Sequence, residues 1–426
     1  MQIIAVNSPK KFKSKNERFY MNGVHIMTKP TGSVCNLDCD YCFYLEKEKL
    51  YPDNKNFKMS EEVLEAYIEQ NIEAQPKEAE FYTFAWQGGE PTLMGLDFFK
   101  KAVSLQKKYS AGKRCENTFQ TNGLLLNDDW CQFFAKEQFL VGISIDGTEQ
   151  QHDIYRKNRA GRGSHKQVLT AIQRLQHYAV ELNALTVLHK GNVDEPLKVY
   201  HYLLSLGIKH IQFTPLVERE AQEKTKDGLT LVHPKFLGKA CVSPWSITAN
   251  QYARFLNIVF DEWTKNGIGD VFINTFETTL GLAIGEPSNI CIHAETCGNA
   301  VILEHNGDLY SCDHFVYPEY KLGNINTKSI SQMAQLPVQK LFGRNKLDDL
   351  SVECQSCKYI SLCNGGCPKH RFEISANGKA NKNYFCDGYK SYYSHVIPKM
   401  RIIYQALING EIPEKLKEKF QNIEVV

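Results

Sequence analysis

Cys35-Asn36-Leu37-Asp38-Cys39-Asp40-Tyr41-Cys42 is the stretch around which this sequence is organised. Its three cysteines are spaced C-x3-C-x2-C and follow a short apolar run, 24–27, that predicts a strand. Three thiolates on one tight loop can hold three irons of a cubic [4Fe–4S] cluster and leave the fourth iron without a protein ligand. Because structural metal sites are normally closed, an open position indicates chemistry on a bound substrate. A zinc loop that lacks one ligand and three unrelated cysteines remain as alternatives.

Length and charge limit the possible partners. The 426 residues are enough for two or three domains, and 42% apolar with 23% charged residues is typical of a soluble globular protein. The net charge of +2 gives no electrostatic footprint for nucleic acid or a membrane. No apolar run is long enough to cross a bilayer, and the basic N-terminus lacks the apolar segment of a secretory signal. We expect no nucleic-acid or membrane partner.

The 14 cysteines are placed unevenly, and eleven of them fall at 35–42 and 291–386. A secreted disulfide scaffold would be shorter and denser in cysteine, so this pattern favours metal binding. Iron–sulfur assembly and thiolate ligation need a reducing compartment, so we expect a cytoplasmic protein. Cys115, Cys131 and Cys241 show no ligand spacing, and Cys131, on a helix rich in aromatic residues, is expected in the core.

Strand-like and helical segments alternate about six times between residues 24 and 214. Such alternation predicts an α/β fold with a parallel sheet and right-handed crossovers. Because polar or glycine-rich motifs follow the strands, we predict a partial (β/α)6 TIM-type barrel with its chemistry at the carboxyl ends of the strands. Six units instead of eight would leave the barrel open on one side for a large substrate.

The predicted organisation has five parts. They are an N-terminal extension (1–21), the barrel (22–240), a helical connector (241–289), a small cysteine-rich domain with a β-hairpin and short helices (290–390) and a C-terminal helical segment (391–426). Within the barrel, the charged segment 218–240 is interpreted as a connecting loop or a partner-facing insertion.

Gly88-Gly89-Glu90 follows the predicted strand 81–86. Two glycines let a ligand approach the backbone closely, and the following carboxylate can hold an amino group. Alone, this triplet fits an ordinary turn between strand and helix. Its position one strand after the cysteine loop makes the two motifs together a stronger signal. Gln87, directly before it, is a candidate substrate contact or an ordinary polar residue at a strand end.

The second cysteine group is large enough for two fully ligated four-cysteine sites. Between Cys297 and Cys312, Asn306-Gly307 predicts a tight hairpin, because glycine tolerates the required positive φ. Two zinc ribbons also fit eight cysteines, but zinc sites usually use paired C-x2-C knuckles and only Cys354/Cys357 has that form. The eight are Cys291, Cys297, Cys312, Cys354, Cys357, Cys363, Cys367 and Cys386.

The pattern C-x3-C-x-Tyr-C, together with Gly88-Gly89-Glu90, resembles the radical S-adenosylmethionine superfamily. The resemblance implies that S-adenosylmethionine chelates the open iron and is cleaved by one electron to methionine and a 5′-deoxyadenosyl radical. The cofactor contacts that it implies are Tyr41 near the adenine, Gly88, Gly89, Glu90, Ser144, Arg156 and Leu216. The alternatives are that Ser144 is a strand-end hydroxyl bonded to the backbone, that Arg156 is a solvated surface residue and that Leu216 is ordinary packing.

The second cysteine group resembles the SPASM domain, the auxiliary-cluster extension of peptide-modifying radical S-adenosylmethionine enzymes. The resemblance implies two closed [4Fe–4S] clusters and therefore three clusters in all. The implied ligands are Cys291, Cys297, Cys312 and Cys367 for the first auxiliary cluster and Cys354, Cys357, Cys363 and Cys386 for the second. Closed clusters are suited to electron transfer, with potentials set by their surroundings.

Segments 306–315 and 363–369 and, more loosely, 215–218 resemble the anaerobic sulfatase-maturating enzymes, over about residues 22–400. The resemblance implies oxidation of one Cys or Ser in a Cys/Ser-x-Pro-x-Arg motif of a sulfatase to Cα-formylglycine. The adenosyl radical would remove a Cβ hydrogen, and an electron would pass to an auxiliary cluster. The implied partners are an unfolded or nascent sulfatase polypeptide and a reduced flavodoxin or ferredoxin-type electron donor, and we expect a monomer.

Asp313, directly after Cys312, is the candidate base for the thiol or hydroxyl proton. A carboxylate with an ordinary pKa of about 4 is a poor match for a thiol near 8.5, so burial is expected to raise the pKa of the Asp313 carboxyl. The alternatives are that Asp313 caps the turn after Cys312 and that His314 is the base.

Two rival functions remain. A SPASM-type maturase of another ribosomal peptide, forming a thioether or a peptide-derived cofactor, usually carries an N-terminal leader-binding domain, and 20 residues are too few for a domain of about 50. A non-catalytic iron–sulfur carrier or a zinc-stabilised binding module would leave the missing fourth ligand beside Gly88-Gly89-Glu90 unexplained.

Overall fold

The structure is a computed structural model that describes residues 23–52, 56–236 and 238–422. The proposed N-terminal extension, 1–21, lies outside the described residues. Among the described residues, ten strands form one sheet in the order β12-β11-β10-β1-β2-β3-β4-β5-β6-β9. Every helix in these ranges is too short or too polar to cross a membrane.

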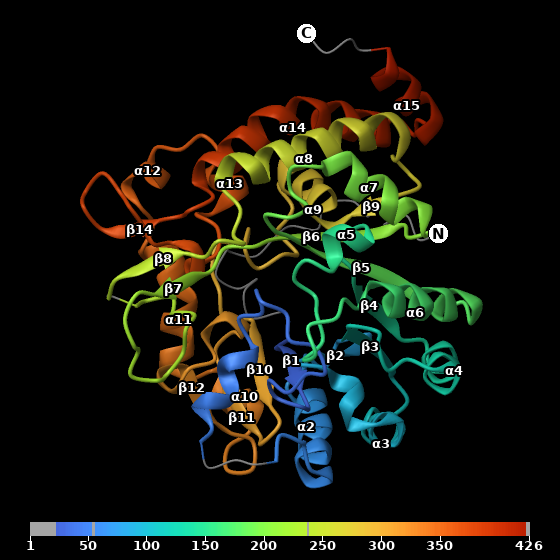
Figure 1. The fold of residues 1–426 in the computed structure, drawn as a ribbon, viewed down its shortest axis with the longest axis vertical. Coiled ribbons are helices and arrows are strands. Elements are labelled where there is room, and N and C mark those ends of the chain that lie inside the picture. The colour runs from blue at the N-terminus through green and yellow to red at the C-terminus, as the bar shows by residue number, and fades with distance from the viewer. Residues whose placement is uncertain (1–22, 53–55, 237, 423–426) are drawn as a thin grey trace.

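The first six strands form the predicted α/β unit. They are β1 (His25–Lys29), β2 (Phe81–Trp86), β3 (Arg114–Thr121), β4 (Leu140–Ser144), β5 (Glu181–Leu188) and β6 (His210–Pro215). Each pairs in parallel with the next, which confirms the predicted partial barrel. The main helices between them are α2 (Glu61–Glu73), α3 (Leu96–Tyr109), α4 (Asp128–Lys136), α6 (His165–His177) and α7 (Pro196–Ser205). Figure 1 shows these helices on the outside of the curved sheet.

Helix α2 shows why the predicted boundaries agree with the structure. The side chain of Ser60 accepts a hydrogen bond from the Val63 amide and caps the first turn, as predicted. Leu64, Tyr67 and Ile68 recur at helical spacing and are fully buried against the sheet. Behind β2 and β3 the core is aromatic, and Cys131 is buried in it, which confirms its predicted packing role.

Three strands of the cysteine-rich segment join the barrel sheet, whereas β13 (Glu373–Ile374) and β14 (Ala380–Lys382) form a separate two-stranded sheet. β10 (Ala300–Glu304) pairs in parallel with β1, and β11 (Asp308–Tyr310) and β12 (Lys321–Asn324) continue antiparallel beyond it. The predicted hairpin is β10–β11, and Gly307 at its turn has φ +86°. On the other edge, β9 (Phe272–Ile273) pairs with β6. The predicted boundaries at 240 and 289 therefore separate strands that share one sheet.

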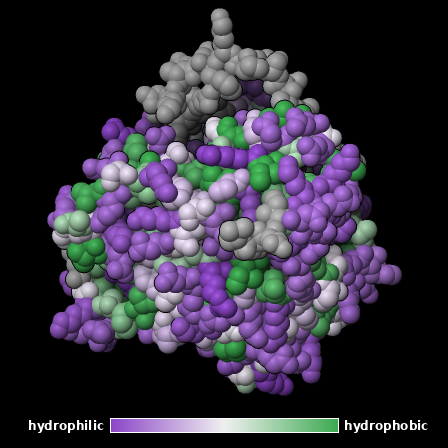
Figure 2. Space-filling view, turned by 90° about the horizontal axis from the view of Figure 1, so that it is seen from above, coloured by the Kyte–Doolittle hydropathy of each residue, from purple (hydrophilic) through white to green (hydrophobic). Residues whose placement is uncertain are grey.

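The C-terminal half packs as helices over one end of the sheet. α8 (Ala249–Asn266) and α14 (Cys386–Ile408) lie side by side, with α9 (Asn274–Ala283) beneath and α15 (Pro413–Gln421) beyond (Figure 1). The predicted boundary at 390 falls inside α14, whose first residue is Cys386. Figure 2 shows the molecule from above, with apolar residues in small separate groups among hydrophilic ones.

The charged segment predicted as a loop or insertion forms a flap. β7 (Arg219–Ala221) and β8 (Ala240–Val242) pair antiparallel at its base. The Glu46 carboxylate, in η1 (Leu45–Leu50) just after the cysteine loop, accepts hydrogen bonds from the Thr230 and Leu231 amides at 2.8 and 3.1 Å. These bonds tie the flap to the segment that carries the three cysteines.

The α8–α14 crossing generates a stability prediction. A Cβ on Gly388 would lie 2.4 Å from the Ala249 carbonyl oxygen, which is backbone and cannot rotate away. Gly388→Ala should therefore destabilise the protein by about 1–3 kcal/mol, typical of overpacking. Gly281→Ala, in α9 with no neighbouring atom closer than 3.8 Å, is the matched control and should be neutral or slightly stabilising. Equal unfolding midpoints of the two variants would contradict this.

Candidate active site

A cavity of about 290 Å³ lies at the carboxyl ends of the parallel strands. Most residues that the sequence singles out line it together, although they come from widely separated parts of the chain. They are Cys35, Cys39, Tyr41, Cys42, Gln87, Gly88, Gly89, Ser144, Arg156, Leu216 and Asp313. The carboxyl ends of parallel strands meet at one edge, which brings these motifs to one place.

The cysteine loop forms one wall of this cavity. Burial, followed by the charge of Glu90, raises the pKa of the Cys35 thiol to about 12. Burial also raises the pKa of Cys39 and Cys42. Buried thiols become thiolates readily only when a cation binds them, so the donor set fits a metal cluster. Within the described ranges, no three His, Cys, Asp or Glu side chains are placed to ligate a single metal ion.

Glu90 has partners within the protein itself. Its carboxylate is fully buried and accepts hydrogen bonds from the Thr92 amide, the Thr121 hydroxyl and the Asn122 amide at 3.1, 2.7 and 2.8 Å. It is not among the residues that line the cavity. These hydrogen bonds connect the loops after β2 and β3, and the predicted contact with an amino group of a ligand stays a prediction.

Gly88 and Gly89 line the cavity but also serve the protein itself. A Cβ on Gly89 would lie 2.1 Å from the Val34 carbonyl oxygen, at the start of the cysteine loop. The Gly89 amide donates to the Gly32 carbonyl at 2.8 Å, and the Glu90 amide to the Val34 carbonyl at 3.0 Å. The close approach that the sequence assigned to a ligand is thus made by the cysteine loop.

Tyr41 and Arg156 are held by a buried aspartate that the sequence reasoning missed. The Tyr41 hydroxyl donates to Asp146 Oδ2 at 2.6 Å, and Arg156 Nε donates to the same oxygen at 2.7 Å. Burial opposes ionisation of Asp146, but the charges of Arg156 and His189 outweigh it and lower the pKa of the Asp146 carboxyl. The only signal in the sequence is the position of Asp146 directly after the strand 140–145.

Asp313 lines the same cavity as the cysteine loop and is paired with Lys29. Lys29 Nζ lies 2.6 Å from Asp313 Oδ1 and 3.3 Å from the centre of the Tyr44 ring, and its side chain is 2% exposed. The Tyr44 hydroxyl donates to Glu304. No side-chain hydrogen bond caps η3 (Asp313–Phe315), so the capping alternative for Asp313 has no support. An adjacent ammonium stabilises an ionised carboxylate, and this partner was not expected from the sequence.

His314 lines the same cavity beside Asp313. Burial lowers the pKa of its imidazole well below the usual value, and the charges of Lys369, Lys29 and Lys47 lower it further. Its Nδ1 lies 3.4 Å from Cys367 Sγ. The better-matched pKa that made His314 an alternative base therefore does not apply at this position.

The eight cysteines of the second group come together in two sets. Burial raises the pKa of Cys312, and the thiols of Cys367 and Cys291 add to this, so these side chains are close. Burial and the Cys291 thiol also raise the pKa of the Cys297 thiol, so Cys297 lies near Cys291. The second set lines a small cavity, and its members are Cys354, Cys357, Cys363 and Cys386. The grouping matches the ligand sets that the resemblance implies.

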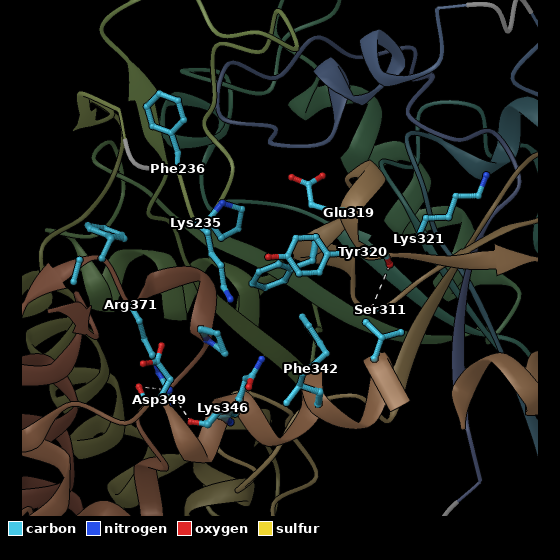
Figure 3. A pocket seen from close by; sticks show the side chains of 18 of the residues that line it. Lys235, Phe236, Ser311, Glu319, Tyr320, Lys321, Phe342, Lys346, Asp349 and Arg371 are labelled. Carbon is cyan, nitrogen blue, oxygen red and sulfur yellow. Dashed lines mark hydrogen bonds between the residues drawn. The ribbon is translucent and has the colours of Figure 1, made fainter. Parts of the chain in front are cut away.

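A second cavity, of about 410 Å³, lies between the flap, the segment around Tyr320 and α11 (Pro337–Asp348) (Figure 3). Phe236, Tyr320 and Phe342 contribute aromatic rings to it. None of the predicted catalytic, cofactor or cysteine residues lines it. The cavity is larger than that of the candidate active site, but it lacks the convergent set of chemical groups.

Comparison with known proteins agrees with this site. The Radical SAM superfamily model matches residues 30–203, and the SPASM iron-sulfur cluster-binding domain model matches 291–358. A serine-type anaerobic sulfatase-maturating enzyme of Bacteroides thetaiotaomicron is 41% identical over 94% of this chain and 95% of its own length. A cysteine-type anaerobic sulfatase-maturating enzyme of Clostridium novyi is 33% identical over 91% of this chain and 99% of its own length.

A solved structure, native anSMEcpe with bound AdoMet and Kp18Cys peptide, superposes with a TM-score of 0.77 at 30% identity. The alignment covers 89% of this chain and 98% of that one. Streptococcus suis SuiB with bound S-adenosylmethionine shares the fold, with a TM-score of 0.57 at 14% identity over 87% of this chain and 81% of that one.

The contact between Gly89 and the cysteine loop generates a prediction for cluster binding. Gly89→Ala would push its Cβ into the Val34 carbonyl and displace the loop that carries Cys35, Cys39 and Cys42. After anaerobic reconstitution, the variant should hold less iron than the parent protein, by about the content of one four-iron cluster, because the cluster of this loop is lost. Gly281→Ala is the control, and full iron content in Gly89→Ala would contradict the prediction.

Proposed function

This chain belongs to the anaerobic sulfatase-maturating enzymes, and we propose that it oxidises one Cys or Ser in a Cys/Ser-x-Pro-x-Arg motif of a sulfatase to Cα-formylglycine. It is a radical S-adenosylmethionine oxidoreductase with a SPASM domain. The single observation that carries the proposal is the cavity that the three-cysteine loop and Asp313 line together. A maturase of another ribosomal peptide is not favoured, because the relatives that align over most of the chain are sulfatase-maturating enzymes.

We propose where the cofactors bind from the positions of the three cysteine sets. Cys35, Cys39 and Cys42 would hold the cluster that binds S-adenosylmethionine, with Tyr41, Gly88, Gly89, Ser144, Arg156 and Leu216 around the cofactor. The two sets of the second group would hold two further [4Fe–4S] clusters, three in all. When bound, these groups supply a radical that removes a hydrogen from Cβ and an acceptor for the remaining electron.

The protein itself must bind, orient and deprotonate the target side chain. Asp313 lines the cavity together with the cysteine loop, and its carboxylate accepts the thiol or hydroxyl proton. Lys29, nearly fully buried at the end of β1, lies 2.6 Å from that carboxylate and fixes its position. Gln87, which donates to Gln120, contributes a polar contact to the peptide from the neighbouring strand.

The shape of the site suits an extended polypeptide. The site is a concave cavity and not a flat surface, so it suits a side chain presented by an extended segment better than a folded protein surface. We therefore propose an unfolded or nascent sulfatase as the substrate. A reduced flavodoxin or ferredoxin-type donor, a monomeric state and a cytoplasmic location complete the proposal, because the clusters need low-potential electrons and reducing conditions.

The test is direct. The anaerobically reconstituted protein is incubated with S-adenosylmethionine, a reductant and paired peptides that contain Cys-x-Pro-x-Arg or Ser-x-Pro-x-Arg. Mass spectrometry should show an aldehyde product on at least one peptide, together with 5′-deoxyadenosine. If 5′-deoxyadenosine forms but neither peptide is modified, the sulfatase assignment is wrong and only the superfamily assignment stands.

Asp313→Asn tests the base. Asparagine keeps the size of the side chain but cannot accept the proton, so product formation should fall about 10²–10⁴-fold, while the iron content stays unchanged. Asp387→Asn is a matched control, because Asp387 also directly follows a predicted ligand, Cys386, but is 65% exposed. Full activity of Asp313→Asn in the peptide assay would refute the assignment.

A further inference from the structure

Two buried cations lie at one end of the second cavity, away from the candidate active site. Figure 3 shows Lys346 on α11 and Arg371 near it, with Phe236 of the flap toward the opposite end. The Arg371 guanidinium donates to the Lys346 carbonyl at 2.6 Å, so the two residues are in direct contact. The proposed function assigns neither of them a role.

Lys346 is directed at the loop that carries the first auxiliary cysteines. Its side chain is fully buried, and Nζ donates to the carbonyls of Cys291 and Ile292 at 2.8 and 3.0 Å and also to that of Ala294. All of these acceptors are backbone oxygens between Cys291 and Cys297. The ammonium therefore lies against the segment that joins two predicted ligands of the first auxiliary cluster.

Arg371 lies between the two auxiliary cysteine sets. Its guanidinium donates to the carbonyls of Asn364, Gly365 and Gly366. These three residues form the short link between Cys363, in the second set, and Cys367, in the first. One cation is therefore close to both sets.

Neither cation has a carboxylate partner within the described part of the chain. The hydrogen bonds of both side chains end on backbone carbonyls, and no ion pair of either residue is found there. A buried charge without a counter-ion is costly, because its desolvation is not compensated. Thiols interact electrostatically with both cations: those of Cys297, Cys367 and Cys291 favour the charged form of Lys346, and those of Cys354, Cys367, Cys297 and Cys363 favour that of Arg371.

We propose that Lys346 and Arg371 are the counter-charges of the two auxiliary clusters and raise their reduction potentials. The inference rests on the proposed function, which places a four-thiolate cluster in each set. When such a cluster accepts the electron released by the oxidised peptide, its net charge becomes more negative by one. A fixed cation nearby stabilises the reduced form more than the oxidised form, so the potential rises.

The two cations should act differently on the two clusters. Lys346 Nζ donates to carbonyls of the segment that begins at Cys291, in the first set, whereas the Arg371 guanidinium donates to the link between the two sets. Removing the charge of Lys346 should therefore lower the potential of the first auxiliary cluster, and removing that of Arg371 should lower both. If the two side chains only held backbone carbonyls in place, replacing them would change the cluster content or the stability of the protein. The reduction potential of a cluster that is retained would then stay the same.

Anaerobic redox titration of the reconstituted full chain, followed by electron paramagnetic resonance, tests this prediction. Lys346→Gln should shift the midpoint of one auxiliary cluster to a more negative potential, and Arg371→Gln should shift both. Lys346→Arg keeps the charge and should retain the parent potential. Lys107→Gln, on α3 and 66% exposed, removes a cation on the outer side of the barrel; it is the control and should change nothing.

A neutral variant with full iron content and unchanged midpoints would overturn the inference. If both neutral variants lose clusters, Asn345→Asp decides, because it adds a negative charge at an exposed position beside Lys346 without removing a cation. It should lower the potential of the first auxiliary cluster, and an unchanged value would again overturn the inference. Aldehyde formation by the parent protein in the peptide assay is scored separately, so failure of the proposed function remains distinguishable.

Discussion

The parallel pairing of β10 with β1 is the constraint on which the candidate site depends. It aligns His25 with Ala300 and Lys29 with Glu304, residues that are more than 270 positions apart in the chain. β1 leads into the cysteine loop, and β10–β11 leads into Cys312 and Asp313. This ladder therefore places the start of the cysteine-rich segment opposite the three-cysteine loop. Side-chain contacts between Lys29 and Asp313 and between Tyr44 and Glu304 reinforce the same junction.

The barrel and the cysteine-rich segment consequently behave as one architectural unit around a shared cavity. The flap is joined to η1 by Glu46, and α14 begins at a predicted cluster ligand, Cys386, before it packs along α8. Each cysteine set is thus attached to an element that is fixed elsewhere in the fold. Because rigid elements hold side chains at a fixed geometry better than free loops do, this attachment keeps the cysteine sets at a defined separation.

The fold and much of the site could be predicted because their signals are local. Strand and helix alternation, the Ser60 cap, the Asn306-Gly307 turn and the cysteine spacings each lie within a few residues of sequence. The missed features are long-range. In the sequence Lys29 is an ordinary strand residue, and only the pairing of β10 with β1 brings Asp313 beside it. The role of Asp146 is likewise visible only in the structure, where Tyr41 and Arg156 both donate hydrogen bonds to it. The hydrogen bonds of Glu90 were missed for the same reason, since its partners Thr121 and Asn122 lie at the end of the next strand, β3.

Buried charge is arranged in a consistent way across the molecule. Asp146 is paired with Arg156, and Asp313 with Lys29, so the charges that line the active cavity are locally balanced. Lys346 and Arg371, by contrast, are satisfied only by carbonyl dipoles, and both are directed at cysteine sets. Burying a cation without a counter-charge is unfavourable because of desolvation, so negative charge near Lys346 and Arg371 would lower the free energy of the folded protein. In the proposed reaction that negative charge resides on the auxiliary clusters and increases when they accept an electron. The cations then favour electron flow away from the oxidised peptide, while the balanced pairs in the active cavity hold the groups that move the proton.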